Sequence, residues 1–335
     1  MSNLPQKREK VIIDIMEKKM NPIELIDFDK CQKNLRFYGG MSGDKYGIDY
    51  NNEPYILKFP QNTQNFKLMN HLSYSNNSYS EFIGSHFYEY VGIPSHKTLL
   101  GTARNHIVVA CKDFCLDEYV LIEFAKLANA ANSESGNIKI PSSGHEDRTT
   151  ILSNILSIIE TLDVLAPLRV EIKERFWDMF VIDAIIANPD RNSGNWGVLN
   201  PVGSKKPEAL TLAPVFDNGN SLNCKISDET IVQSSSKEIT EISLKVASVF
   251  QHIDEKGEAH KINPYLFIKK MSNNDCNKAV VRLAPRIQDV LKKIKELIDA
   301  LPGMSNERKT FYSNSMTIRY NNSILPAYKE LSSKA

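Results

Sequence analysis

Three polar side chains in the middle of the chain could together serve a phosphate group, a metal ion and an attacking hydroxyl. Asp190 and Asn195 lie close together in the turn-rich segment 187–197, and Asp217 follows on a later segment, before a glycine. Phosphoryl transfer needs a carboxylate that accepts the proton of the hydroxyl, and oxygen ligands that hold Mg²⁺ on the phosphates. The pattern therefore predicts Asp190 as the catalytic base and Asn195 and Asp217 as metal ligands.

Each of these segments also has an ordinary structural explanation. Asp, Asn and Gly are common in turns because they bond their own backbone, so Asp190 and Asn195 alone indicate no more than an Asx-rich loop. Asp217 alone could be a turn residue after a core strand. Their succession, with a turn-rich excursion between them, is what favours a magnesium site.

A lysine and a glutamate are placed to support this chemistry. Lys58 interrupts the apolar run 55–59, where an ammonium group is costly unless an anion accompanies it. Glu81 lies near the start of a helix expected over 79–91 and is its natural partner. The alternative is that Lys58 lies on the solvent face of an edge strand. The predicted catalytic set is thus Asp190, Lys58 and Glu81.

A glycine-rich segment precedes the first expected hairpin. Clustered glycines let backbone N–H groups approach phosphate oxygens. The segment has neither the Gly-Lys-Ser/Thr of a P-loop nor the pattern G-x-G-x-x-G, so a flexible hairpin loop explains it equally well. Its candidate ATP-binding residues are Gly39, Gly40, Met41, Ser42 and Gly43.

The first third of the chain has the pattern of a small antiparallel sheet with one inserted helix. Short apolar runs are separated by turn residues, which is typical of hairpins. The helix over 79–91 ends at Gly92. The two expected hairpins are 46–50 with 55–59 and 99–102 with 106–111.

The remainder has mainly helical periodicity. Helices are expected over 151–165 and 172–187, and Pro285 is expected to open another. A polar loop is expected over 129–148, and 305–332 is polar and at most helical. We therefore predict an α+β, two-lobed, protein-kinase-like fold. Its expected parts are a helical extension (1–20), a nucleotide-binding N-lobe (21–114) and a catalytic C-lobe (115–335).

Composition narrows the class of protein. The 335 residues are 41% hydrophobic and carry a net charge of +1, so no strong field favours nucleic acid or an anionic membrane. No apolar run approaches the roughly 20 residues that span a bilayer. The five cysteines have no zinc-site spacing, which indicates free thiols in a reducing, cytoplasmic compartment. We expect a monomer that binds neither nucleic acid directly nor membranes.

At this point several motifs resemble the HipA-like serine/threonine kinases, in particular their short, free-standing branch, which includes the cell-translocating kinases. The likeness covers about residues 25 to 325, and its catalytic motifs are specific. Segments 109–114 and 176–181 add to it. The motifs are Lys58-Phe59-Pro60, Ser80-Glu81, the loop Asn188-x-Asp190-Arg191-x-x-x-Asn195-Trp196, and Asp217-Asn218-Gly219 in place of Asp-Phe-Gly.

The resemblance implies a bacterial protein kinase that uses ATP and Mg²⁺, phosphorylates a protein substrate and autophosphorylates. Carried over to this chain, Lys58 would hold phosphate and Glu81 would steady it. The backbone at Cys111, Lys112 and Asp113 would meet adenine. Secretion or delivery to a host cell stays an open alternative to a cytoplasmic location.

Two features depart from HipA itself. HipA autophosphorylates a serine of its glycine-rich loop, whereas Phe37 stands at the comparable position here. The segment 1–30 is also too short for the extra N-terminal subdomain of HipA. The resemblance therefore implies neither a toxin–antitoxin role nor DNA contact through a partner.

Two other functions fit parts of the pattern. Type II phosphatidylinositol 4-kinases share Asp-Arg-x-x-x-Asn-Trp and an Asp-Asn-Gly metal turn, but this chain lacks a basic or palmitoylation patch near the cleft. A nucleotide-binding pseudokinase is the second alternative. Degraded pseudokinases usually lose the strand lysine, the base or the metal aspartate, and all three are present here.

Autophosphorylation is expected in the serine-rich segment between Lys58 and Glu81. The composition of 73–80 favours a mobile surface loop, and a phosphate there would meet the positive end of the next helix. The alternative is that Ser78 or Ser80 caps that helix. The candidate sites are Ser75, Ser78 and Ser80.

Overall fold

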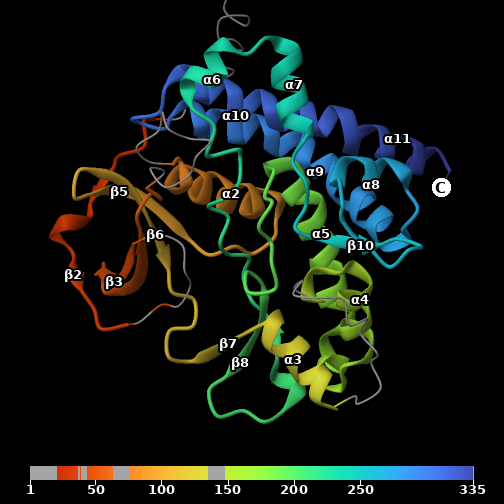
Figure 1. Ribbon diagram of the computed structural model, residues 1–335. Coiled ribbons are helices and arrows are strands. Elements are labelled where there is room, and N and C mark those ends of the chain that lie inside the picture. Colours follow the sequence, from red (N-terminus) through yellow and green to blue (C-terminus); the bar gives the residue numbers. More distant parts are fainter. Residues whose placement is uncertain (1–20, 37, 39–43, 63–74, 135–147, 335) are drawn as a thin grey trace, which may run out of the picture.

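The structure of the protein, a computed structural model, describes residues 21–36, 38, 44–62, 75–134 and 148–334 (Figure 1). The helix expected over 1–20 and the glycine-rich residues 39–43 lie outside this described part, as do Phe37 and Ser73. A mixed sheet is followed along the chain by a mainly helical region, which confirms the predicted α+β, two-lobed fold.

Six strands between Ile26 and Lys112 form the sheet, in the spatial order β1-β5-β6-β4-β3-β2. β1 is parallel to β5, and the other neighbours are antiparallel. The strands are β1 Ile26–Asp27, β2 Gln32–Lys33, β3 Lys45–Tyr50, β4 Glu53–Lys58, β5 Thr98–Ala103 and β6 His106–Lys112.

Both expected hairpins are confirmed, and their turns explain their register. Asn51 and Asn52 join β3 to β4 with φ angles of 50° and 61°, and Arg104 and Asn105 join β5 to β6 with 47° and 60°. Left-handed φ at both central residues is what a two-residue type I′ turn requires, and asparagine tolerates it.

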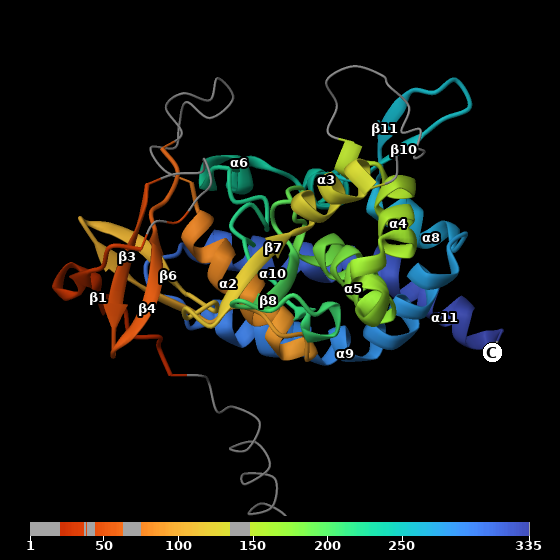
Figure 2. The same cartoon turned by 90° about the horizontal axis from the view of Figure 1, so that it is seen from below.

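The inserted helix α2 spans Asn77–Val91 and ends at Gly92, whose φ of 91° closes the helix in the left-handed conformation. It lies between the sheet and the helices of the second region, as both views show (Figures 1 and 2). Apart from a few exposed or half-buried positions, it is buried all round. A helix buried on every side must satisfy its polar side chains within the protein.

The second region is built around α5 and the 26-residue helix α9. A three-stranded sheet has the order β7-β8-β9. Its first strand, β7, precedes α5 along the chain, and β8 and β9 follow α5. Its strands are β7 Tyr119–Glu123, β8 Gly197–Pro201 and β9 Thr211–Leu212, and β10 Gln251–Ile253 and β11 Ala259–Lys261 form a separate two-stranded sheet. The helices are α3 Phe124–Glu134, α4 Leu152–Thr161, α5 Arg169–Ile186, α6 Asp228–Gln233, α7 Ser236–Leu244, α8 Pro264–Lys270, α9 Asn274–Asp299, α10 Asn306–Arg319 and α11 Leu325–Ser333.

Several boundaries differ from expectation. Pro285 lies inside α9 and does not open a helix. An interior proline costs about 3 kcal/mol. Buried apolar residues continue on both sides of it, from Cys276 to Ile298, and each large one contributes about 1.5–3 kcal/mol. Burial of the whole stripe therefore outweighs the proline. Strand β7 was not expected either, because its partner β8 lies beyond α5 along the chain and no local pattern signals their pairing.

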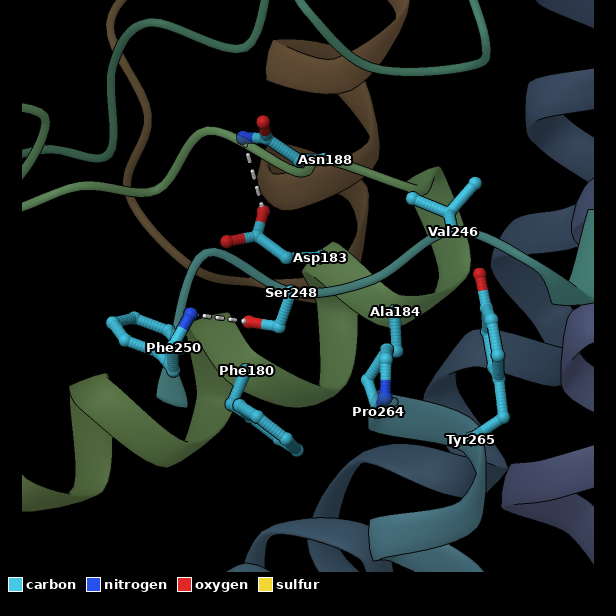
Figure 3. Close-up of a pocket in the computed structure, with 9 residues that line it drawn as sticks. All are labelled: Phe180, Asp183, Ala184, Asn188, Val246, Ser248, Phe250, Pro264 and Tyr265. Atoms are coloured by element: carbon cyan, nitrogen blue, oxygen red, sulfur yellow. Dashed lines mark hydrogen bonds between the residues drawn. The ribbon is translucent and has the colours of Figure 1, made fainter. Parts of the chain in front are cut away.

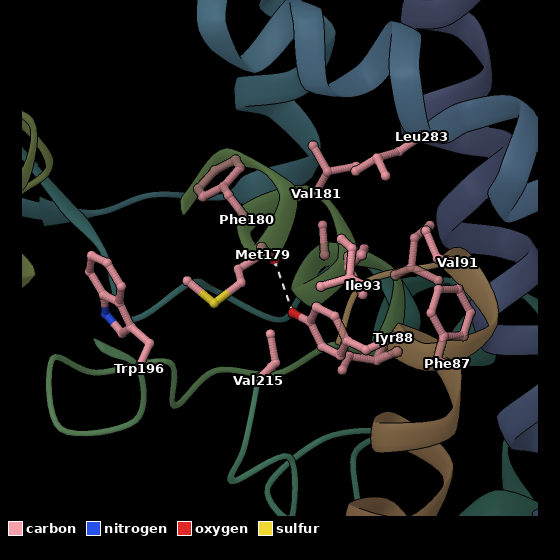
Figure 4. Packing of buried hydrophobic residues seen from close by; sticks show 14 of the residues in the cluster. Phe87, Tyr88, Val91, Ile93, Met179, Phe180, Val181, Trp196, Val215 and Leu283 are labelled. Atoms are coloured by element: carbon pink, nitrogen blue, oxygen red, sulfur yellow. Dashed lines mark hydrogen bonds between the residues drawn. The ribbon is translucent and has the colours of Figure 1, made fainter. Parts of the chain in front are cut away.

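One hydrophobic core joins α2 to the helices of the second region. Phe87, Tyr88 and Val91 of α2 pack in the same cluster as Met179 of α5 and Leu283 of α9 (Figure 4). The Tyr88 hydroxyl oxygen lies 3.4 Å from the Met179 carbonyl oxygen. The position of α2 is therefore set from the helical side as well as by the sheet.

All five cysteines lie in the described part of the chain and are free thiols, as predicted. Among the described helices, none is long and apolar enough to cross a lipid bilayer.

Packing at Gly101 gives a test of the sheet. A β-carbon at this position would lie 2.1 Å from the Ile26 carbonyl oxygen and 2.4 Å from the Phe28 ring. Gly101→Ala should therefore lower the free energy of unfolding by about 1–3 kcal/mol, as overpacking does. Urea unfolding measures this change. Thr102→Ala on the same strand removes atoms instead of adding them and is the control. Equal midpoints for Gly101→Ala and the parent would contradict the close approach of β1.

Candidate active site

Lys58 joins three elements at the end of β4. Its Nζ lies 2.9 Å from Glu81 Oε2 on α2 and 2.9 Å from Asp217 Oδ1 on the loop after β9. The structure thus brings together the sequence-predicted lysine, glutamate and metal aspartate. Burial alone would lower the pKa of Lys58, but the charges of Glu81 and Asp217 outweigh it and hold that pKa well above its ordinary value.

Glu81 is a fully satisfied buried carboxylate, with 2% of its side chain exposed. Oε2 contacts Lys58, while Oε1 accepts from the backbone N–H of Asn218 at 2.7 Å and contacts His96 Nε2 at 3.0 Å. Burial would raise the pKa of Glu81, but Lys58 and these hydrogen bonds lower it well below its usual range. Glu81 therefore stays ionised at neutral pH.

His96 and Ser85 belong to this site but were missed by sequence reasoning. His96 Nε2 lies 3.1 Å from Ser85 Oγ, and Ser85 Oγ accepts from the Asn218 side-chain amide at 3.1 Å. The backbone N–H of His96 also donates to Val215, two residues before Asp217. The residues form one buried group only because α2 and the loop after β9 meet in space.

Cys111 lies against Glu81 and His96 instead of at an open edge of the sheet. Its Sγ lies within 4.8 Å of ligand atoms of Glu81 and His96, a spacing that suits a metal ion. Burial raises the pKa of the Cys111 thiol far above its ordinary value, so it stays protonated. The Cys111 thiol is neutral, and Glu81 already contacts three donors. The two side chains therefore suit close packing behind Lys58 better than binding of a metal ion.

The expected adenine-binding strand has only part of its backbone available. The N–H groups of Lys112 and Asp113 donate to the carbonyl oxygens of Lys97 and Pro54. The Asp113 carboxylate accepts from Tyr38 at 3.0 Å and from Arg36 at 3.3 Å. Polar contacts with adenine would therefore fall to carbonyl oxygens here and to the backbone that follows.

Asp190 lies on the loop after α5 with both carboxylate oxygens oriented by amides. Oδ1 accepts from Asn192 Nδ2 at 2.9 Å, and Oδ2 accepts from Asn220 Nδ2 at 2.7 Å. Asn195 donates its own amide nitrogen to the Asp190 carbonyl oxygen at 2.7 Å. This bond leaves the side-chain oxygen of Asn195 as the end that can bind a metal ion.

Arg191 connects the predicted catalytic loop (187–196) with the predicted metal loop (213–227) and is only 1% exposed. Its guanidinium donates to the carboxylate of Asp183 on α5 at 2.9 and 3.1 Å, and to Asn218 Oδ1 at 2.6 Å. Its Nη1 donates to the carbonyl oxygens of both Asn195 and Phe216. Arg191 Nη1 therefore holds the backbone of Asn195, one predicted metal ligand, next to Phe216, which directly precedes the other predicted ligand, Asp217.

The side-chain oxygens of the two predicted metal ligands decide whether the site suits Mg²⁺. Asn195 and Asp217 lie on neighbouring loops and offer an amide oxygen and a carboxylate, the hard oxygen ligands that Mg²⁺ prefers. Asp217 is 39% exposed and has a φ of 59°, an uncommon backbone conformation that aims its side chain toward Lys58. The donor set fits the ion.

Asp183 could have been found from the sequence, because it is a charged residue within the otherwise apolar run 179–186 at the end of α5. It accepts from the Tyr88 hydroxyl at 2.8 Å as well as from Arg191. Asp183 and Asn188 also line a cavity of about 10 Å³ (Figure 3). That volume suits about one water molecule, so this cavity is not a substrate pocket.

Lys45 is a further residue that sequence reasoning missed. It lies just after the glycine-rich segment and pairs across the hairpin with Lys58, so both side chains lie on one face of the sheet. Burial and the charge of Lys58 lower the pKa of Lys45, while Asp217 opposes this shift. Two lysines side by side near Asp217, the predicted metal ligand, suit a polyphosphate.

Gly84 shows how closely α2 approaches the metal loop. A β-carbon at this position would lie 2.7 Å from Asn218 Cβ, closer than side chains pack. Glycine inside a helix costs about 1 kcal/mol relative to alanine. Here it lets the backbone of α2 come near enough for Glu81 and Ser85 to reach Asn218.

The three autophosphorylation candidates are buried in this conformation. Ser78 and Ser80 lie inside α2, and their exposures are 3% and 0%; Ser75, just before the helix, is 5% exposed. The Ser78 hydroxyl donates to the Ile107 carbonyl oxygen at 3.0 Å. The helix begins after Asn76, so neither Ser78 nor Ser80 caps it, and that alternative is wrong.

Comparisons with known proteins agree with this geometry. The serine/threonine-protein kinase CtkA of Helicobacter pylori (strain J99 / ATCC 700824) is 37% identical over 287 residues, covering 85% of this chain and 82% of CtkA. The chain belongs to the CtkA family of serine/threonine-protein kinases. The expected resemblance to the short branch of the HipA-like kinases is confirmed by this relative.

One solved structure supports the same family. The crystal structure of a Helicobacter pylori proinflammatory kinase CtkA superposes with a TM-score of 0.78 at 30% identity, covering 93% of this chain and all of that one. A HipA–HipB–operator DNA complex from Shewanella oneidensis MR-1 reaches a TM-score of 0.46 at 14% identity over 98% of this chain and 75% of that one, too low to carry an argument. No family model matches the chain.

The buried Arg191–Asp183 pair generates a prediction about stability. Asp183→Ala should lower the free energy of unfolding by about 3–5 kcal/mol, because it leaves a guanidinium buried without its counter-ion. The control is Asp299→Ala, which removes the exposed pair with Lys295 and should cost at most about 1 kcal/mol. Chemical denaturation compares the two. Equal effects would show that Arg191 can reach water.

Proposed function

We propose that the protein is an ATP- and Mg²⁺-dependent kinase that transfers the γ-phosphoryl group to serine or threonine residues of a protein substrate. The observation that carries this proposal is that Lys58 contacts Glu81 and Asp217 at once, while Arg191 holds the loop of Asp190 and Asn195 against the loop of Asp217. These contacts support the proposal that the residues needed for phosphoryl transfer act together.

Each residue has a defined task in this proposal. Asp190 accepts the proton of the substrate hydroxyl as its oxygen attacks the γ-phosphorus, and ADP leaves. Asn195 and Asp217 would hold Mg²⁺, which neutralises charge on the phosphates. Lys58 would then exchange Asp217 for phosphate oxygens, while Glu81 keeps its ammonium in place.

The nucleotide would bind between the sheet and the catalytic loops. The backbone of Gly39, Gly40, Met41, Ser42 and Gly43 is proposed to cover the phosphates, with Lys45 and Lys58 below. Adenine is proposed to contact the backbone around Cys111, Lys112 and Asp113. This assignment supports the division into an N-lobe (21–114), a C-lobe (115–335) and a preceding segment (1–20).

Autophosphorylation at Ser75, Ser78 or Ser80 requires a conformational step. Because all three serines are buried, the segment before α2 must open before Ser75 can receive phosphate, and the first turn of α2 must open before Ser78 or Ser80 can. Ser75 needs the smallest opening, since it precedes the helix.

We propose a monomer acting in the bacterial cytoplasm without direct contact with nucleic acid or membranes.

Loss of the base or of the metal ligand should separate chemistry from binding. Asp190→Ala should abolish transfer to protein, a loss of at least about 10³-fold, and should largely spare binding of Mg-ATP. Asp217→Ala should abolish transfer and also weaken Mg-ATP binding. Phosphate transfer from labelled ATP and titration with a fluorescent ATP analogue measure the two effects.

The same assay examines the alternative functions. Phosphatidylinositol in vesicles tests for a lipid kinase, and a generic protein substrate tests for a protein kinase. Transfer to lipid alone would replace the proposal with the first alternative. Nucleotide binding without any transfer by the parent protein would indicate a pseudokinase.

Phosphopeptide mapping after incubation with Mg-ATP tests the autophosphorylation sites. We expect phosphate on Ser75 in preference to Ser78 and Ser80, with slow kinetics that follow the opening of α2. Asp190→Ala is the negative control. Phosphate confined to Ser42, or to residues outside 73–80, would overturn this expectation.

A further inference from the structure

We propose that Asn220 is a positioning residue for the base Asp190, and that Asn77 in the first turn of α2 holds Asn220 in place. This inference rests on the proposed kinase function. Neither asparagine belongs to the motifs on which that function depends.

The contact between Asn220 and Asp190 is direct. Asn220 Nδ2 donates to Asp190 Oδ2 at 2.7 Å across the gap between the two loops, which are distant along the chain. Asn220 Oδ1 accepts from Asn77 Nδ2 at 3.4 Å, and the same Asn77 nitrogen donates to the Gly219 carbonyl oxygen at 3.1 Å. Because Asn77 contacts the oxygen end of the Asn220 amide, the nitrogen end is directed at Asp190.

The second oxygen of Asp190 is held from its own loop. Asn192 Nδ2 donates to Asp190 Oδ1 at 2.9 Å, while Asn192 Oδ1 accepts from the Gly194 N–H at 2.9 Å. A carboxylate fixed at both oxygens cannot rotate, so its remaining lone pairs keep one direction. That direction decides whether a substrate hydroxyl can hand over its proton.

The donors are neutral, which suits a base. An ammonium or guanidinium in the place of the Asn220 amide would stabilise the ionised carboxylate strongly and weaken its affinity for a proton. An amide orients the oxygen while adding no net charge. The neighbouring cation of the same loop, Arg191, is directed instead at Asp183 and at backbone carbonyls.

Asn77 links this arrangement to the rest of the site. Asn77 and Glu81 lie one turn apart on one face of α2, so they contact consecutive residues of one loop: Glu81 holds Asn218, and Asn77 holds Gly219 and Asn220. The helix that positions the phosphate-binding lysine thus also positions the base.

The variants Asn220→Ala, Asn220→Gln and Asn77→Ala test this arrangement. Asn220→Ala should lower kcat for transfer to protein by about 10–100-fold, the range for loss of a group that orients a reactive residue. Its melting temperature should stay within a few degrees of the parent, and its affinity for an ATP analogue within about twofold. Asn220→Gln, which keeps an amide donor, should recover part of the loss.

Coupling between the two asparagines tests the second half of the proposal. Asn77→Ala should lower kcat less than Asn220→Ala does, and the double variant should be no slower than Asn220→Ala alone, because both act through one contact. Additive losses would overturn the role of Asn77. The matched control is Asn322→Ala, an exposed asparagine whose amide donates to the Ile318 carbonyl oxygen one turn earlier.

The outcomes separate this inference from the proposed function. An inactive parent protein would overturn the proposed function itself. An active parent, an inactive Asp190→Ala and a fully active Asn220→Ala would overturn only the role of Asn220. If Asn220→Ala lowered ATP affinity and melting temperature together with kcat, the role of Asn220 would be structural. That result would also overturn the positioning role.

Discussion

Burial of charge is the constraint on which the site depends. Arg191 and Glu81 are each about 1% exposed, and an ionised group taken out of water is costly unless partners surround it. Arg191 meets this requirement with hydrogen bonds to α5 and to both loops. Glu81 meets it with Lys58, His96 and the Asn218 backbone. Displacing either loop would remove hydrogen bonds from a buried charge, so these contacts hold the loops in register.

Helix α2 carries this constraint from one half of the molecule to the other. Its contacts with the metal loop come from Asn77, Glu81, Gly84 and Ser85, which share one face, and Tyr88 continues that face to Asp183. Its apolar residues pack in the core with α5 and α9. A helix fixed on both sides in this way keeps Lys58 and Glu81 paired, and its opening is correspondingly costly.

Much of the site followed from residue types and order. Lys58 within an apolar strand and Asp190, Asn195 and Asp217 on successive loops were recognisable because phosphoryl transfer requires them. The contacts of His96 and Asn218 with Glu81 could not be recognised in the sequence. No local pattern indicates that a histidine after one helix contacts a loop from the other half of the molecule. Asp183 is the intermediate case: a lone charge in the otherwise apolar run 179–186 indicates a buried partner, but not which one.

The sequence by itself determined the local elements and the chemistry that they could carry. Turn asparagines, glycine at the end of α2 and apolar periodicity act over a few residues, so hairpins and most helices could be predicted. Tertiary structure decided the rest, because those features depend on which distant segments pack together. It placed Pro285 inside a helix, paired β7 with β8, and buried Ser78 and Ser80 in the first turns of α2. It also set Asn220 against Asp190, a contact between two loops that only the packing of α2 brings within 2.7 Å.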